Sequence, residues 1–171
     1  MSTPQFPIPT PIHMFLLCIA VAAVSAAGQT RFDVAPSAGF FSYQDFGSKK
    51  TGASASVELL LRRSDFGIAL TEEVGGGAAY LATFGDVTYS HSSGPWSILL
   101  GTGPSHVKHK ELALAKPWNA EAELGHTWRH TTLFLRYRYC HYVVNGFRER
   151  LTMTGPAFAF GVRIPIGRRP A

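Results

Sequence analysis

Apolar and polar residues alternate along the chain after residue 30, in stretches of roughly ten residues separated by Gly, Pro, Ser, Asp and Asn. A period of two is the pattern of a β-strand that shows a different face to each side. No segment in this region keeps a helical period for three turns. The pattern predicts eight strands, over residues 31–43, 53–62, 65–74, 79–90, 95–103, 117–128, 131–143 and 151–165.

One face of most predicted strands is apolar, and the other carries charged or very small residues. The charged positions on the second face are Glu58, Glu73, Glu121, Glu123, Arg136, Arg138 and Arg163. A soluble barrel packs its large apolar side chains inward, so inward charges are stable only where the outer face meets lipid. We therefore predict an all-β fold, an eight-stranded antiparallel transmembrane β-barrel of the outer-membrane type, with these charges paired in the lumen.

The N-terminus has the pattern of a secretory signal. Residues 1–30 contain no Asp, Glu, Lys or Arg, and residues 14–24 form an apolar core that small residues follow. This core is short for a membrane span. We predict a signal peptide over residues 1–27, with an uncleaved anchor helix as the alternative, and a single barrel domain over residues 28–171 in the bacterial outer membrane. Cys140 is then the only cysteine, and we interpret it as a small packing residue.

Composition agrees with this prediction. The chain has 171 residues, of which 46% are hydrophobic and 16% charged, and its mean hydropathy is only +0.05. This much apolar material excludes a disordered chain, and one short apolar run excludes a helical membrane bundle. The net charge of +5 would suit nucleic acid, but a secreted, lipid-facing barrel excludes that partner. We expect a monomer.

The connections predict which end of the barrel faces the periplasm. Short turns at Arg63-Ser64, residues 91–94 and Arg129-His130 would be periplasmic, and the longest connection, residues 104–116, would be extracellular. That connection contains His106 and His109, which lack a third metal ligand, so we expect no metal and no cofactor. It is basic and could meet the phosphates of lipopolysaccharide. The glycines at 75–77 and at 101 and 103 have no phosphate-loop context and are expected to serve turns or close packing.

The end of the seventh predicted strand carries the candidate chemistry. Its alternation places His141 on the lipid side, near the extracellular rim. Here the sequence resembles the PagL-type lipid A 3-O-deacylases, eight-stranded outer-membrane barrels that remove an ester-linked acyl chain from lipid A. The resemblance covers residues 118–166 and rests on Trp118 to Gly125, Arg136 or Arg138, His141-Tyr142, Asn145-Gly146 and Ile164-Pro165-Ile166. It implies that His141 is a catalytic base and that Asn145 serves the oxyanion or positions the substrate.

Two further parts of the family's site are missing. Val143 stands where the family has its nucleophilic serine, and the only acid after His141 is Glu149. A histidine without nucleophile or orienting acid should not run a serine-esterase mechanism. We therefore predict a catalytically degenerate barrel with a structural or lipopolysaccharide-interacting role. One alternative is an active carboxylic-ester hydrolase on lipid A with a relocated nucleophile, such as Thr152 or Thr154. The other, a soluble secreted barrel for a small apolar ligand, is opposed by the inward charges.

Overall fold

A computed structural model describes residues 30–45, 48–75, 80–109, 112–113, 115–145 and 150–166. Nine strands account for almost all of them: β1 (Thr30–Asp45), β2 (Ser48–Arg63), β3 (Phe66–Gly75), β4 (Tyr80–Ser93), β5 (Trp96–His109), β6 (Leu112–Ala113), β7 (Ala115–Trp128), β8 (Thr131–Asn145) and β9 (Arg150–Ile166). The predicted signal peptide over residues 1–27 lies outside the described residues. Within the described part of the chain, no helix is long and apolar enough to cross a membrane.

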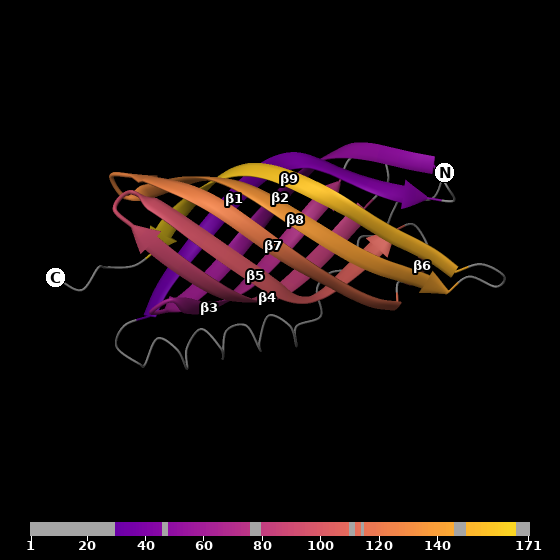
Figure 1. Ribbon diagram of the computed structural model, residues 1–171, viewed down its shortest axis with the longest axis horizontal. Helices are drawn as coiled ribbons and strands as arrows, with labels where there is room; N and C mark the ends of the chain where they lie inside the picture. The colour runs from indigo at the N-terminus through magenta and orange to yellow at the C-terminus, as the bar shows by residue number, and fades with distance from the viewer. Residues whose placement is uncertain are drawn as a thin grey trace, which may run out of the picture. The chain divides into compact units, whose positions relative to one another are not determined.

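Eight long strands close into one antiparallel barrel (Figure 1). Their hydrogen-bonding order is β4-β3-β2-β1-β9-β8-β7-β5, and a β4–β5 pairing closes the ring, while the short β6 pairs with the end of β5. Closure gives every long strand a neighbour on both sides, so the barrel has no open sheet edge. The predicted eight-stranded antiparallel barrel is confirmed.

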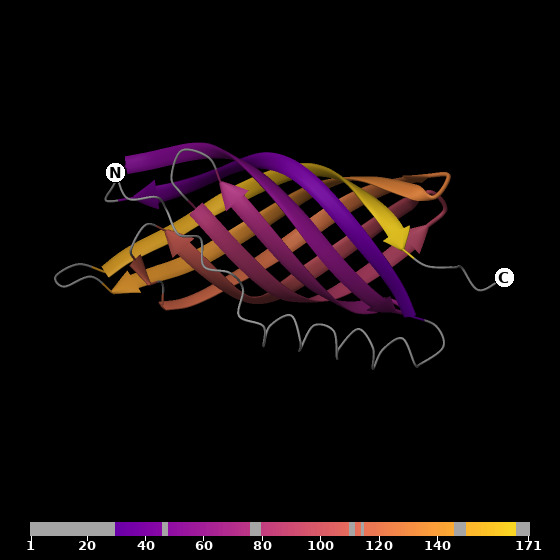
Figure 2. The same cartoon turned by 180° about the vertical axis from the view of Figure 1, so that it is seen from behind.

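One end of the barrel is built from short turns. Two-residue turns at Ser64-Asp65, Gly94-Pro95 and Arg129-His130 join paired strands, and they lie at the end where β1 begins and β9 finishes (Figure 2). Ser64, Gly94 and Arg129, the first residues of these turns, have φ of 56°, 59° and 56°. Two-residue hairpin turns require positive φ because it matches the twist of the flanking strands. In outer-membrane barrels this is the periplasmic end.

The predicted long connection over residues 104–116 is wrong. β5 continues to His109, where it pairs with Tyr80 of β4, and β7 starts at Ala115. The β4–β5 ladder therefore extends the hairpin beyond the apolar stretch from which the strand was predicted. The sequence pattern ended early because alternation of apolar side chains stops where a strand leaves the lipid, although backbone pairing continues.

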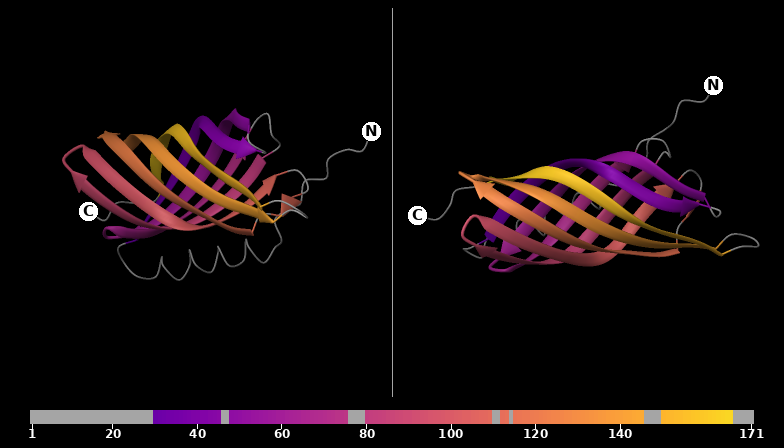
Figure 3. Two further views of the ribbon diagram at one scale, coloured as in Figure 1. Left: turned by 45° about the vertical axis from the view of Figure 1, so that its right-hand side comes forward. Right: turned by 45° about the horizontal axis from the view of Figure 1, so that its top comes forward.

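Side chains alternate between the outer wall and the lumen as the sequence predicts. Strands cross the barrel wall obliquely (Figure 3), and their outward side chains include Phe40, Phe66, Val87 and Trp128, which are 64–70% exposed. The inward positions are buried and mostly polar or charged, with Leu60, Ala69 and Leu99 forming a small apolar cluster. The hydrophobic surface therefore lies on the outside, where only lipid can cover it.

Two glycines on neighbouring strands have opposite requirements. A Cβ added at Gly103 of β5 would overlap the carbonyl oxygen of Gly85 of β4, whereas a Cβ at Gly85 would meet nothing within 4 Å. The backbones of β4 and β5 therefore approach closely at Gly103, which only a residue without a side chain permits.

We expect Gly103→Ala to destabilise the barrel and Gly85→Ala to be tolerated. The clash at residue 103 involves backbone, which cannot move aside as a side chain can, so the cost should be about 1–3 kcal/mol. Urea unfolding in lipid vesicles, followed by the heat-modifiable gel mobility of folded barrels, measures the difference. Equal stabilities of the two variants would contradict the close approach.

Candidate functional site

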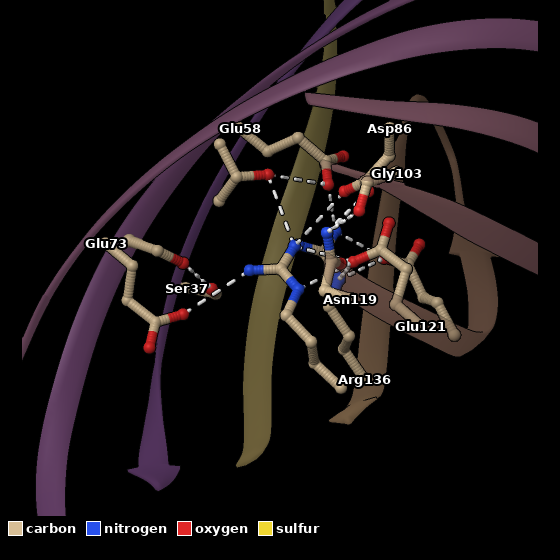
Figure 4. A network of polar contacts seen from close by, with 12 residues as sticks. Ser37, Glu58, Glu73, Asp86, Gly103, Asn119, Glu121 and Arg136 are labelled. Atoms are coloured by element: carbon tan, nitrogen blue, oxygen red, sulfur yellow. Dashed lines mark hydrogen bonds and ion pairs between the residues drawn. The ribbon is translucent and has the colours of Figure 1, made fainter. Parts of the chain in front are cut away.

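Three buried arginines cross the lumen and meet carboxylates from the opposite wall. Arg136 and Arg138 occupy successive inward positions of β8, where the register pairs them with Glu123 and Glu121 of β7. Arg163 projects from the neighbouring strand β9, and all three arginines are 2–3% exposed. Figure 4 shows Arg136 among carboxylates contributed by several strands.

Arg136 and Arg163 share two carboxylates. Arg136 Nη2 lies 2.6 Å from Glu58 Oε2 and 2.7 Å from Glu123 Oε2. Arg163 Nη1 donates to Glu58 Oε1 at 2.7 Å, and its Nη2 donates to Glu123 Oε2 at 2.8 Å. This four-membered cluster ties β2 to β7, β8 and β9 across the barrel. The two guanidinium groups also lie against the ring of Phe134, with Cζ 4.9 and 5.4 Å from its centroid.

Arg138 anchors a second cluster, nearer the extracellular end. Its Nη2 donates to Glu121 Oε2 at 2.6 Å, and its Nη1 donates to Glu73 Oε2 at 3.5 Å. Asp86 Oδ2 lies 4.0 Å from the same Nη2, and the ring of Phe84 lies 4.1 Å from Cζ. The predicted pairing of inward glutamates with Arg136, Arg138 and Arg163 is therefore confirmed.

Glycines on β5 make room for these side chains. A Cβ at Gly101 would lie 2.8 Å from Glu121 Cγ. Gly103, the register partner of Asn119, has no side chain to block the lumen, and Asn119 Nδ2 donates to Asp86 Oδ1 of β4 at 2.9 Å and to Gly103 O at 3.2 Å. The close-packing interpretation of Gly101 and Gly103 is confirmed.

Sequence reasoning missed two members of this lumen, Asp33 and Asp86, both on strands with weak alternation. The inward row of β4 includes Phe84 beside Asp86, while its outward row includes Thr83 and Gly85, so polarity alone does not separate the two faces. The faces of the neighbouring strands are better defined, and pairing β4 with them in register would have placed Asp86 inside the barrel.

Charge is divided unevenly along the lumen. The three central arginines face five carboxylates, those of Glu58, Glu73, Asp86, Glu121 and Glu123. At the periplasmic end the balance reverses, because the single carboxylate of Asp33 accepts from both Arg31 and Arg62 at 2.7 Å. Between these side chains, cavities of about 50 Å³ and about 10 Å³ remain, enough for a few water molecules.

His141 lies on the outer wall of the barrel, as its position in the alternation predicts. Its ring is 5.9 Å from that of Trp118, at an interplanar angle of 32°, and Trp118 also contacts Tyr139 at 6.0 Å. The register places Thr154 of β9 opposite His141, and Thr152 opposite Val143. Asn145 is the last residue of β8 and pairs with Arg150, but its side chain lies outside the described residues.

A second polar group interrupts the apolar outer wall on the other side of β5. Thr83 Oγ1 donates to Glu72 Oε1 at 2.9 Å, and His106 of β5 stands opposite Thr83 in the register. His106 is thus part of a strand rather than of a loop. No group of three His, Cys, Asp or Glu side chains among the described residues is arranged to hold a metal ion.

Comparison with known proteins supports the fold. No protein-family model and no curated protein matches the chain. Among solved structures, the crystal structure of Neisserial surface protein A (NspA) is similar with a TM-score of 0.62 and 13% identity, covering 78% of this chain and 96% of that one. The solid-state NMR structure of outer membrane protein AlkL in DMPC lipid bilayers gives a TM-score of 0.44 and 11% identity, with 99% of both chains covered.

The chain is therefore a small antiparallel β-barrel of the outer-membrane class. Its apolar outer wall and its charged, ion-paired interior are the arrangement that a lipid bilayer stabilises, and they agree with a location in the bacterial outer membrane.

We expect Arg136→Gln to destabilise the barrel by about 3–5 kcal/mol, because it leaves Glu58 and Glu123 with less compensation in a buried site. Arg129→Gln is the matched control. Arg129 is exposed in a turn and contacts only the Trp128 ring among the interactions described, so its loss should change stability by less than about 0.5 kcal/mol. Urea unfolding in lipid vesicles gives both values, and a small effect of Arg136→Gln would contradict the role of the network.

Proposed function

We propose that this protein is a non-conducting outer-membrane barrel that interacts with lipopolysaccharide at its extracellular end and lacks deacylase activity. The filled lumen supports the first part. Two clusters of ion pairs cross it between strands on opposite sides, and the described cavities hold only a few water molecules. Eight-stranded barrels are in general just wide enough for their own side chains.

The distribution of lysine carries the lipopolysaccharide part of the proposal. Four of the five lysines of the chain, Lys49, Lys50, Lys108 and Lys116, lie near strand ends on the side opposite the periplasmic turns, and Lys110 lies outside the described residues. Lysine is absent from the periplasmic end of the barrel strands and from the membrane-crossing centre. The outer leaflet presents the phosphates of lipopolysaccharide at this height, and cations close to an anionic membrane surface contribute about 1 kcal/mol each.

Replacing Lys49 and Lys50 with glutamine should lower the affinity for phosphorylated lipid A by roughly 30-fold, since two such contacts contribute about 2 kcal/mol. Native mass spectrometry of the detergent-solubilised barrel with lipid A measures the bound fraction. The matched control is the double variant Arg63→Gln and Arg129→Gln, which removes the same charge at the periplasmic end and should leave lipid A binding unchanged. Equal losses in both double variants would contradict a site at the extracellular end.

The surroundings of His141 support the absence of deacylase activity. Its described ring neighbour is Trp118, an apolar partner that neither accepts nor relays a proton from the imidazole as a triad acid would. Val143 replaces the family's serine in the sequence, and a valine has no nucleophilic atom. An imidazole beside aromatic rings at the lipid boundary suits a membrane-anchoring position.

The register favours one alternative. Thr154 is the direct cross-strand partner of His141 in the backbone register of β8 and β9. A threonine hydroxyl at this position is the relocated nucleophile that an active lipid A esterase would need, with His141 as its base and Asn145 as a positioning residue.

Mass spectrometry of lipid A from cells with and without the protein separates these two functions. We expect the same acyl pattern in both, at matched levels of folded barrel. Loss of one ester-linked chain in the expressing cells would instead favour the esterase, and then His141→Ala and Thr154→Val should each restore the full pattern. Thr152→Val, which lies opposite Val143, is the matched control on the same strand.

A further inference from the structure

The periplasmic mouth of the lumen contains a polar cavity of about 50 Å³ that the proposed function does not use. Eight of its lining residues bring positive charge or hydroxyl groups: Arg31, Arg62, Arg163, Ser90, Ser92, Ser97, Thr127 and Thr132. This volume corresponds to roughly three to five water molecules, or to one small tetrahedral anion. We propose that this periplasmic cavity binds a phosphate-class oxyanion.

The local charge favours an anion. Asp33 is completely buried and accepts from Arg31 and Arg62, both at 2.7 Å, so two guanidinium groups share one carboxylate. Glu123 also lines the cavity, but its carboxylate is already held by Arg136 at 2.7 Å and by Arg163 at 2.8 Å. The cavity therefore carries one positive charge that no carboxylate among its described neighbours balances.

Arg62 supplies the donors. A guanidinium has five N–H donors in a planar fork that matches the oxygens of phosphate. The described contacts of Arg62 use Nη2 on Asp33 and Nη1 on Ser90, the second at 3.3 Å, so each of these two nitrogens keeps a second N–H for a ligand. Arginines that keep such donors next to a polar cavity are typical of oxyanion sites.

Access is from the periplasmic side. Arg31 is the second residue of β1, Arg62 is the last but one residue of β2, and Ser97 is the second residue of β5. These positions place one side of the cavity next to the periplasmic end of the barrel. Arg31, which lines the cavity, has a side chain that is 45% exposed, so this part of the lining reaches the surface at the periplasmic end. The ligand could therefore be free inorganic phosphate or the headgroup of an inner-leaflet phospholipid, and both present the same oxyanion.

The test is a titration of the isotope-labelled barrel in maltoside micelles, which contain no phosphate. Inorganic phosphate should shift the side-chain N–H resonances of Arg62 in NMR spectra in a saturable way, while chloride at equal ionic strength should not. Phosphatidylglycerol added to the same micelles forms the second arm. A saturable shift with this lipid alone identifies a headgroup, and one with inorganic phosphate identifies the free ion.

Two variants and one control locate the site. Arg62→Gln removes the central donor, and Ser97→Leu fills the cavity without changing any charge. Each variant should therefore weaken phosphate binding at least tenfold. The affinity is measured from the shifts of backbone resonances at the neighbouring strand ends. Ser97→Leu keeps the test decisive if the loss of Arg62 prevents folding. Arg63→Gln, the next residue on the opposite face, should bind like the wild type. No saturable shift with either ligand, or equal affinity in Ser97→Leu and wild type, would overturn the proposal.

Discussion

The pairing of Arg136, Arg138 and Arg163 with glutamates across the lumen is the interaction on which the rest of the barrel depends. A lipid-embedded wall gains no stability by turning apolar side chains inward, so its interior has to be held by polar contacts. Each guanidinium bridges strands that are not neighbours in the ring, as Arg163 does between Glu58 of β2 and Glu123 of β7. Removing one partner would leave buried charge without compensation.

The same network limits where the protein can act. Buried side chains cross the lumen, and Gly101 and Gly103 of β5 leave room for them and for the close approach of β4. What remains is the outer wall and the two ends, which differ in charge. Carboxylates outnumber arginines in the central lumen, and two arginines face one aspartate at the periplasmic mouth. Four of the five lysines lie near strand ends on the opposite side. Binding of anions at either end then needs no change in the barrel itself.

The number of strands, the faces of most strands and the two groups of residues that form ion pairs could be predicted from the sequence, because side chains alternate between the two faces of a strand. Glu121 and Arg138 are inward in every register that keeps their strands amphipathic. The ends of the strands could not be predicted, since β5 continues to His109 through residues that no longer alternate. Asp86 and the Asp33 pair with Arg62 were missed because a mixed face gives no signal until neighbouring strands fix the register.

His141 shows why the fold and the chemistry of such a barrel separate. Alternation places Arg138 and Cys140 inside and Tyr139 and His141 outside on the same strand, so the outer row can change without touching the lumen contacts that hold the wall. Backbone pairing with β7 and β9 depends on neither row. A change of residue in the outer row of such a strand therefore costs little stability, provided that the new residue suits a strand as valine does. The fold alone then says nothing about activity, which depends on the atoms within reach of one imidazole.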